Sequence, residues 1–395
     1  MSRDKKAAPA AKGARAAPSP QLELPETRGD TRRVEKIERL SPAARDGRIV
    51  ADRVRWFDAA ARDLPWRRRR DPYAVWLSEI MLQQTRVETV IPYFERFLER
   101  FPDVTALARA EPDEVLSLWS GLGYYRRARQ LHAAAKAVAD RHGGAFPGEA
   151  AALRDLPGVG AYTAGAIASI AFGKREPLVD GNVARVFARL EGLAEPVGST
   201  AMTKALWERA SALVPADRPG RFNEALMELG ATVCTPKDPA CKRCPLESIC
   251  VARAEGRVAE LPVAASKRPV PSVSMVALVL TRGAEVLLAR RAEGGLFGGL
   301  WEPPMVEAAS IGEAKKALGW LGLGRSVKLA EVGTVKHVLT HRELTVHVAR
   351  GSLDADAEAP GEPKAPYEKA GFYGTKEAAI GISTLARKVL ATARG

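Results

Sequence analysis

All four cysteines of the 395-residue chain lie within one short segment, at Cys234, Cys241, Cys244 and Cys250. Disulfides that stabilise a secreted protein of this length would need more cysteines, spread more widely along the chain. The spacing Cys-x6-Cys-x2-Cys-x5-Cys instead lets four thiolates reach one metal centre. Structural zinc usually takes two separated Cys-x2-Cys pairs, and only one such pair is present. The pattern therefore favours an iron-sulfur cluster in a reducing compartment over zinc and over four unrelated thiols.

The composition narrows the class of protein. Hydrophobic residues make up 46% of the chain and charged residues 27%, as in ordinary globular proteins. No stretch approaches the roughly 18 apolar residues that a membrane span requires. The formal net charge of +13 favours a polyanionic partner such as nucleic acid. We therefore expect no membrane association, and two or three domains at about 150 residues each.

Four stretches of different composition divide the chain. Residues 1–45 are rich in Ala, Pro, Lys and Arg, which predicts a disordered basic tail; a targeting peptide is the alternative, but the stretch has no apolar core. Residues 46–255 show helical spacing of apolar residues and no strand pattern. Residues 256–271 have the composition of a linker. Residues 272–395 predict an α+β domain, because three runs have the length and β-branched content of strands. These runs are 273–280, 285–289 and 344–349.

The helical part carries start and stop signals for individual helices. Asp71 followed by Pro72 predicts a capped helix start, and apolar residues follow at once. Thr85 and Glu88 form a Thr-x-x-Glu capping box, which predicts that the next helix starts at Thr85. Gly143 is typical of a helix stop. These signals predict a domain made almost entirely of helices.

Residues 156–165 read LPGVGAYTAG, with Gly-Val-Gly between two apolar helical stretches. Such a hairpin exposes backbone N–H groups at a helix N-terminus, and these can hold a phosphate without reading base sequence. A tight turn between two packed helices is the alternative interpretation. Combined with the cysteine spacing, the string favours a DNA-binding hairpin.

Several strings in residues 50–255 together resemble one family, the MutY-type adenine DNA glycosylases of the helix-hairpin-helix class. The strings are LPWR from Leu64, WLSEIMLQQT from Trp76, GLGYYRRAR from Gly121, LPGVGAYTAG from Leu156 and VDGNVARV from Val179. The resemblance implies a 4Fe-4S cluster on the four cysteines and a double-stranded DNA partner that contains mispaired adenine. It also implies a monomer in the bacterial cytoplasm, associated with the nucleoid.

Glu79 is the candidate general acid. It lies among Trp76, Leu77, Ile80 and Met81, so packing of the helix would bury its carboxyl and raise its pKa. A pKa near 6 would leave about 10% of the carboxyl protonated at neutral pH. A solvated position on an amphipathic helix is the alternative. The resemblance implies that Glu79 protonates a ring nitrogen of adenine and handles the attacking water.

Asp180 stands at the start of a predicted helix, where its side chain can serve as an N-cap. Breaking an N-glycosidic bond leaves an oxocarbenium-like sugar, and a carboxylate on its face can stabilise that charge. The resemblance assigns this second role to Asp180, with Asn182 helping to position the chemistry. Both roles are compatible.

Tyr162 distinguishes two chemistries. In the related endonuclease III-type enzymes a lysine at this hairpin position attacks the sugar, forms a Schiff base and cleaves the strand. A phenol cannot form that intermediate. We therefore expect a monofunctional enzyme that leaves an abasic site.

Flipping a nucleotide out of the duplex leaves a gap that a side chain must fill. Gln84, at a predicted helix junction, and Tyr124, in a glycine-flanked loop, match the wedge residues of the family. Four further residues match those that line its adenine pocket, although ordinary helix packing would also explain them. They are Trp66, Arg67, Leu82 and Glu224.

GGLFGGLWEPP from Gly294 resembles a Nudix-type domain. Nudix hydrolases hold Mg²⁺ with several carboxylates, whereas this chain has Glu313 followed by lysines, so hydrolase activity is not expected. In the adenine glycosylases this domain recognises 8-oxoguanine through a loop that commonly reads Phe-Ser-His. The matching residues are Leu339, Thr340 and His341, so the aromatic side chain of the loop is replaced.

The sequence thus predicts a multidomain protein, with a mainly α helix-hairpin-helix glycosylase domain and an α+β Nudix-like domain. Its expected activity is monofunctional removal of adenine mispaired with 8-oxoguanine or guanine. A bifunctional endonuclease III-like glycosylase/lyase is the nearest alternative. A non-catalytic DNA-damage-binding protein and a nucleotide pyrophosphohydrolase are the others.

Overall fold

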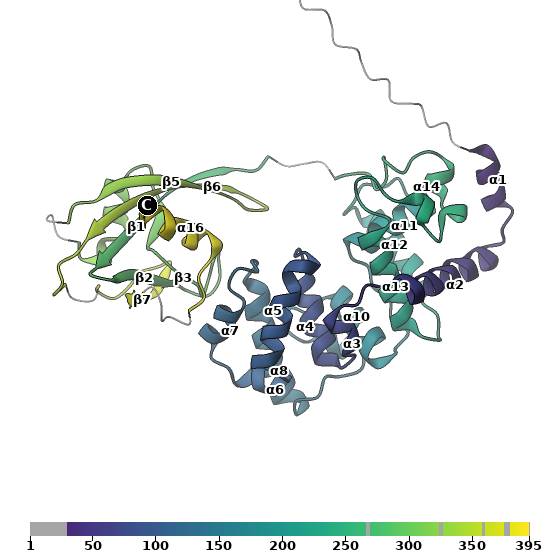
Figure 1. Cartoon of the computed structure of the whole chain (residues 1–395), viewed down its shortest axis with the longest axis horizontal. Coiled ribbons are helices and arrows are strands. Elements are labelled where there is room, and N and C mark those ends of the chain that lie inside the picture. Colours follow the sequence, from purple (N-terminus) through teal and green to yellow (C-terminus); the bar gives the residue numbers. More distant parts are fainter. Residues whose placement is uncertain (1–29, 266–268, 324–326, 358–359, 375–379, 395) are drawn as a thin grey trace, which may run out of the picture.

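The computed structural model describes residues 30–265, 269–323, 327–357, 360–374 and 380–394. A helical domain occupies one end of the molecule, and a domain built around a β-sheet occupies the other (Figure 1). The prediction of a multidomain α and α+β protein is confirmed. Apart from the end of the basic tail, the predicted domain boundaries stay predictions.

The helical domain follows the spacing of its apolar residues. Its α-helices are α1 (Thr31–Glu38), α2 (Pro42–Ala60), α3 (Pro65–Arg68), α4 (Pro72–Leu82), α5 (Val87–Arg100), α6 (Val104–Arg109), α7 (Pro112–Leu118), α8 (Arg126–His142), α9 (Ala150–Arg154), α10 (Ala161–Phe172), α11 (Gly181–Glu191), α12 (Thr200–Leu213), α13 (Pro219–Thr232) and α14 (Val251–Ala254). Short 3-10 turns lie at Cys241–Arg243 and Glu247–Ile249, inside the cysteine loop. Two apolar cores result, one around α4, α5 and α8 and one around α11, α12 and α13.

The predicted start of α4 is confirmed, because the side chain of Asp71 accepts a hydrogen bond from the backbone N–H of Ala74. The capping box at Thr85 and Glu88 is wrong. Helix α5 begins at Val87, and its N-cap residue Arg86 makes no side-chain cap. The Thr85 hydroxyl instead donates to the carbonyl of Gln83 and accepts from Arg127, so tertiary contacts use the oxygen that capping would need.

The expected disordered tail is too long. Residues 1–29 lie outside the described residues, but α1 and the start of α2 fall within residues 30–45. Asp30 caps α1, and the Arg33 guanidinium pairs with Glu247 of the cysteine loop at 3.3 Å. The polar composition of α1 gives this short helix little stability of its own, and its contacts with α14 stabilise it.

The predicted hairpin at residues 156–165 joins α9 to α10. Gly158 adopts a positive φ of 74°, which glycine tolerates best. Gly165 allows α10 to approach the extended segment that leads to α11. A Cβ atom at position 165 would lie 2.0 Å from the backbone oxygen of Pro177.

We expect Gly165→Ala to lower the free energy of unfolding by at least about 2 kcal/mol, because backbone must move to accommodate the added methyl group. Urea titration followed by circular dichroism measures this change. Gly160→Ala in the same hairpin is the control, since nothing lies within 4 Å of its added Cβ. Equal stabilities of the two variants would contradict the close approach.

The described residues of the C-terminal domain form a seven-stranded mixed sheet in the order β3-β2-β1-β6-β5, with β4 paired to β1 and β7 paired to β2. Strands β1 and β6 are parallel, and the other pairs are antiparallel. The strands are β1 (Ser272–Arg282), β2 (Glu285–Arg291), β3 (Trp301–Glu302), β4 (Met305–Glu307), β5 (Ala330–Val338), β6 (Glu343–Ser352) and β7 (Tyr367–Gly374). The three predicted strands correspond to β1, β2 and β6.

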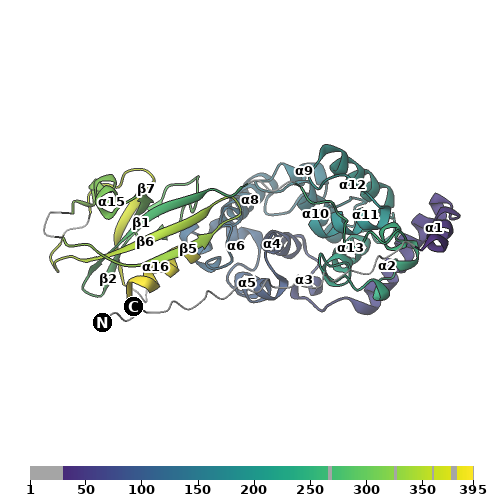
Figure 2. The ribbon, with the colours of Figure 1, turned by 90° about the horizontal axis from the view of Figure 1, so that it is seen from above.

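Strand β1 explains why its sequence reads as one apolar run. Val276, Leu278 and Leu280 point to one face of the sheet, where α15 (Ile311–Ala317) packs. Ala277 and Val279 point to the other face, against α16 (Thr384–Arg394). Helices cover both faces, so every residue of the central run is buried. Figure 2 shows α15 and α16 on either side of the sheet.

The two domains also touch directly, at the segment between α7 and α8. Ser120 and Tyr125 both donate to the backbone carbonyl of Ile382, at 2.8 and 3.1 Å. Arg290 of β2 pairs with Asp113 of α7 at 3.3 Å. These polar contacts hold the sheet domain against the helical domain, so residues of both can line one cleft.

Candidate active site

A cleft of about 1680 Å³ lies where the two domains meet. Both predicted carboxylates, Glu79 and Asp180, line it, and so do residues of the loop after β5. Every residue assigned to catalysis or substrate binding from the sequence lies on this one surface. The predicted site residues that line the cleft are Trp66, Arg67, Glu79, Leu82, Gln84, Tyr124, Tyr162, Asp180, Asn182, Glu224, Leu339, Thr340 and His341.

Glu79 lies near the C-terminal end of α4, in a helix whose residues 73–81 are all buried. Glu79 is 6% exposed, so the prediction that packing of the helix buries this residue is confirmed. Burial raises its pKa to about 7, and the negative charges of Asp180 and Glu224 act in the same direction. About half of the carboxyl is therefore protonated at neutral pH.

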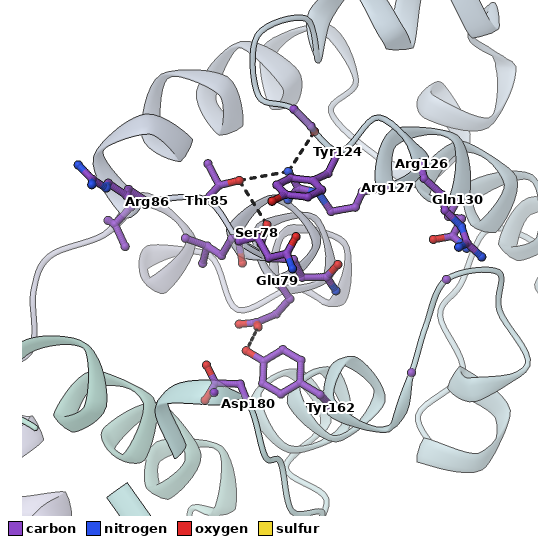
Figure 3. Close-up of a pocket in the computed structure, with 18 of the residues that line it drawn as sticks. Ser78, Glu79, Thr85, Arg86, Tyr124, Arg126, Arg127, Gln130, Tyr162 and Asp180 are labelled. Atoms are coloured by element: carbon purple, nitrogen blue, oxygen red, sulfur yellow. Dashed lines mark hydrogen bonds between the residues drawn. The ribbon is translucent and has the colours of Figure 1, made fainter. Parts of the chain in front are cut away.

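Tyr162 is the direct hydrogen-bond partner of Glu79. The Tyr162 hydroxyl donates to Oε2 of Glu79 (Figure 3). It also lies 3.2 Å from the sulfur of Met227. Burial and the two neighbouring carboxylates raise the pKa of the phenol well above its usual value, so it remains a donor. In Figure 3 the Glu79 carboxyl points toward Tyr162, and Asp180 lies beside Tyr162.

Asp180 is the N-cap residue of α11. Its Oδ1 accepts from the backbone N–H of Val183 at 2.7 Å, and its Oδ2 accepts from Nδ2 of Asn182 at 3.1 Å. Burial raises its pKa, whereas these hydrogen bonds lower it. The N-cap interpretation is confirmed, and the carboxylate still lines the cleft.

Asn182 is held by a guanidinium that also reaches the cysteine loop. Arg185 donates to Oδ1 of Asn182 at 2.9 Å, to the carbonyl of Gly230 at 2.8 Å and to the carbonyl of Cys234 at 2.7 Å. Gly230 permits this arrangement, because a Cβ there would lie 2.7 Å from Cβ of Asn182. The start of α11 is thus fixed against both α13 and the cysteine loop.

The predicted purine pocket forms one wall of the cleft. Trp66 is 8% exposed and packs edge-on against Phe94, with ring centroids 5.5 Å apart. Glu224 is 5% exposed and pairs with Arg70 at 3.0 Å, while Nε of Arg67 lies 3.8 Å away. This wall therefore offers an indole, guanidinium groups and a carboxylate to a planar ligand.

Gln84 and Tyr124, the predicted wedge residues, both adopt positive φ angles, 56° and 48°. Such angles are uncommon for residues with side chains and concentrate at functional sites. The Tyr124 side chain is 49% exposed, and its hydroxyl shares a 3.2 Å hydrogen bond with the Thr340 hydroxyl of the other domain. The two residues present side chains into the cleft from neighbouring turns.

The loop after β5 differs from the sequence-based expectation in one respect. Thr340 and His341 are exposed, but Leu339 is half-buried and packs against the apolar core under α16. Val338 is 72% exposed instead. Both apolar side chains line the cleft, but Val338 is the exposed one, whereas Leu339 is held partly in that core.

Sequence reasoning missed three residues that line the wall around Glu79, namely Arg62, Met227 and Glu228. Glu228 carries no motif signal, and it lies one helical turn after Glu224 on α13. That spacing places both side chains on one face of a helix, which was the available clue.

The four cysteines are half-buried beside the core around α11. Burial raises the pKa of Cys244 to about 12 and of Cys250 to about 11. Arg189 donates to Sγ of Cys234 at 3.5 Å and to the carbonyl of Thr235 at 2.7 Å. Among the described residues, no three acidic, histidine or cysteine side chains are grouped so as to hold a single metal ion.

The helix expected to replace the Nudix metal motif is α15. Its Glu313 accepts from the backbone N–H of Ala309 at 2.9 Å, which is a capping contact. Lys315 and Lys316 follow in its last turn. The absence of hydrolase activity stays a prediction.

The comparisons with known proteins agree with both domains. Residues 77–212 match the HhH-GPD superfamily of base excision DNA repair proteins, and residues 275–392 match the NUDIX domain. Within the part of the chain that the structure describes, no helix combines the length and apolar character needed to cross a membrane.

Three relatives carry the name adenine DNA glycosylase. The Homo sapiens protein is 41% identical over 74% of this chain, a match that spans 65% of that protein. The Mus musculus protein is 40% identical over 79% of this chain and 71% of its own length. The Buchnera aphidicola subsp. Baizongia pistaciae protein is 33% identical over 74% of this chain and 83% of its own length. On this similarity, together with a helix-hairpin-helix domain and a NUDIX domain in one chain, the protein belongs to the adenine DNA glycosylase family.

Proposed function

We propose that the protein is a monofunctional DNA glycosylase that hydrolyses the N-glycosidic bond of adenine mispaired with 8-oxoguanine or guanine. The observation that carries this proposal is the meeting of Glu79 and Asp180 in one cleft. Their carboxyls lie close enough for the charge of Asp180 to raise the pKa of Glu79. Glu79 can therefore carry the proton, while the hydrogen bonds that Asp180 accepts from Val183 and Asn182 favour its anionic form.

These residues supply a balanced reaction. Protonated Glu79 donates its proton to a ring nitrogen of the flipped adenine, and the C1′–N9 bond breaks with both electrons leaving on the base. The Asp180 carboxylate stabilises the positive charge that develops on the deoxyribose. Glu79, now an anion that accepts from Tyr162, takes a proton from the water that attacks C1′. The products are free adenine and an abasic site.

Tyr162 supports the monofunctional outcome, since its hydroxyl cannot form a Schiff base with the sugar. In this proposal the purine binds against Arg62, Arg67, Trp66 and Glu224, which line the cleft. Gln84 and Tyr124, which line the same cleft, fill the gap in the duplex. Thr340, His341 and Val338 face the cleft from the other domain, where the base opposite the adenine would lie.

One assay tests the activity and separates the alternatives. Duplex DNA with adenine opposite 8-oxoguanine is incubated with the protein, and half of each sample is then treated with hot alkali. Strand scission only after alkali is expected. Scission without alkali indicates a glycosylase/lyase, and none in either half indicates a non-catalytic binder. Mg²⁺-dependent hydrolysis of nucleoside triphosphates would instead support the alternative function, a nucleotide pyrophosphohydrolase.

We propose further that the cysteine loop holds a 4Fe-4S cluster. The four irons of such a cluster each take one cysteine thiolate, so the thiolates stand farther apart than around a single ion. Arg189 supplies a positive charge beside Cys234 that suits a thiolate ligand. When bound, the cluster would hold the loop that Arg185 ties to Asn182.

Purified protein is expected to contain about four irons per chain. It is also expected to show a broad visible absorbance from thiolate-to-iron charge transfer. Metal analysis checks this. The Cys244→Ser variant serves as the comparison and is expected to lose iron. Stoichiometric zinc without iron would contradict the cluster.

The partner in this proposal is double-stranded DNA, and we expect a monomer that acts in the bacterial cytoplasm. The net charge of +13 favours binding to the DNA backbone.

A further inference from the structure

Glu228 is a buried carboxylate that no step of the proposed reaction uses. It lies on α13, is 1% exposed and lines the cleft. Its Oε1 accepts from the backbone N–H and from Nε of Arg62, at 3.2 and 2.8 Å, and its Oε2 accepts from Nη2 of Arg62 at 2.8 Å. The same Oε2 accepts from Nη2 of Arg67 at 2.9 Å. One carboxylate thus holds two guanidinium groups.

Glu228 is an anion throughout the neutral range. Burial alone would raise its pKa, but hydrogen bonds from Arg62 and Arg67 lower that pKa to about 2. A buried carboxylate with such partners is strongly coupled to them, because removal of its charge leaves the guanidinium groups without their anion. The position of both arginines therefore depends on Glu228.

Arg67 is fixed on several sides. Its Nη1 donates to the carbonyl of Arg62 at 3.0 Å, its guanidinium carbon lies 4.9 Å from the centre of the Phe57 ring, and its Nε lies 3.8 Å from Glu224. Among the contacts that Arg67 makes with described residues, only the one with Glu228 is a short hydrogen bond to a charged partner. Without it, a backbone carbonyl and the Phe57 ring still contact the guanidinium, but its close anion is gone and the remaining carboxylates of the cleft attract it more strongly.

The carboxylate that matters most is Glu79. The charged and titratable groups that act on it come from four elements: Arg67 from α3, Tyr162 from α10, Asp180 from the start of α11 and Glu224 from α13. Arg67 is the cation of this set, and its charge favours the Glu79 anion. A shift of Arg67 toward Glu79 would therefore favour the form that cannot protonate adenine.

We propose that Glu228 is a positioning residue of the adenine site, which holds Arg62 and Arg67 along the purine wall and keeps the Arg67 charge away from Glu79. The inference rests on the proposed glycosylase activity. It assigns to Glu228 two separable effects, one on the binding of the flipped nucleotide and one on the acid that cleaves the bond.

The test compares single-turnover rates of full-length, cluster-loaded protein between pH 5 and 9, on duplex with adenine opposite 8-oxoguanine. For Glu228→Gln we expect a maximal rate about tenfold lower, and an alkaline limb whose midpoint moves to lower pH by at least about half a unit. Affinity for a duplex with 2′-fluoro-2′-deoxyadenosine, which resists cleavage, is expected to fall about fivefold or more.

A matched control is Glu191→Gln, which also removes a carboxylate that binds two arginines, Arg45 and Arg209, but outside the cleft. It is expected to lower the melting temperature without moving the pH midpoint. A double variant provides the second check. Because Glu228 acts through Arg67, adding Glu228→Gln to Arg67→Gln should leave the midpoint of Arg67→Gln unchanged.

An unchanged midpoint and unchanged nucleotide affinity in Glu228→Gln would overturn the inference and leave Glu228 a structural residue. If that variant does not fold, Glu228→Asp decides instead. Its shorter side chain keeps the charge but cannot reach both arginines, so a smaller shift in the same direction is expected, and no shift overturns the proposal. Wild-type protein without adenine release would overturn the proposed function, and the inference with it.

Discussion

Replacing Glu79 with glutamine is expected to slow adenine release about a thousandfold, within the range that general acids contribute. The amide preserves the shape of the side chain and can still accept from the Tyr162 hydroxyl. It has no proton of suitable acidity to give to the purine, and as an amide it cannot take one from water. Single-turnover excision of adenine opposite 8-oxoguanine measures the effect.

Glu88→Gln is the control for this substitution, because Glu88 is exposed on α5 and lies outside the cleft. It should keep the wild-type rate within about twofold. If Glu79→Gln retained more than a tenth of the wild-type rate, proton donation by Glu79 would be excluded.

The same substitution has an expected effect on stability that depends on pH. Burial raises the pKa of Glu79 from 4.5 to about 7 in the folded protein, so the folded state holds this proton more tightly than the unfolded state. The stabilising contribution is complete below the unfolded pKa and is lost as pH rises toward 7. The Glu79→Gln variant lacks this pH-dependent loss. Its free energy of unfolding relative to wild type should therefore be higher at pH 8 than at pH 4, by up to roughly 3 kcal/mol.

Urea unfolding of wild type and Glu79→Gln at pH 4 and pH 8 checks this expectation. Wild-type excision should also decline above pH 7, by about tenfold per unit once Glu79 is largely ionised. A stability difference that is the same at both pH values would show that the Glu79 carboxyl is not held in its neutral form.

Asp180→Asn is expected to retain the fold and to reduce the rate of excision by about a hundredfold to a thousandfold. The asparagine oxygen can still cap α11 by accepting from the backbone N–H of Val183, so the helix start survives. The substitution removes the negative charge that, in the proposed reaction, stabilises the sugar cation. Single-turnover rates and melting temperatures, measured on the same preparations, separate the two effects.

Asp71→Asn is the matched control, since Asp71 caps α4 in the same way and its carboxylate lies outside the cleft. Both variants should melt within a few degrees of wild type, and only Asp180→Asn should lose activity. Excision by Asp180→Asn above a tenth of the wild-type rate would remove Asp180 from the chemistry.

Local signals in the sequence predicted much of the fold. Asp71 and Gly143 mark a helix start and a helix end as expected, because caps depend on neighbouring residues alone. The capping box at Thr85 failed, because Arg127 from α8 occupies the Thr85 hydroxyl. Helix α1 was missed, since its stability comes from packing on the cysteine loop and not from its own composition.

The sequence by itself determined the chemical repertoire of the site: two carboxylates, a phenol where a lysine would cleave the strand, and four clustered thiols. Residue type and short spacing along the sequence are enough to identify reactive groups and helix caps. Only the tertiary structure decided that Glu79 is buried against Tyr162, that Glu228 holds two arginines, and that Leu339 is half-buried while Val338 is exposed. Burial, electrostatic coupling and the direction of a side chain depend on which distant segments pack together. Local sequence patterns do not determine this packing.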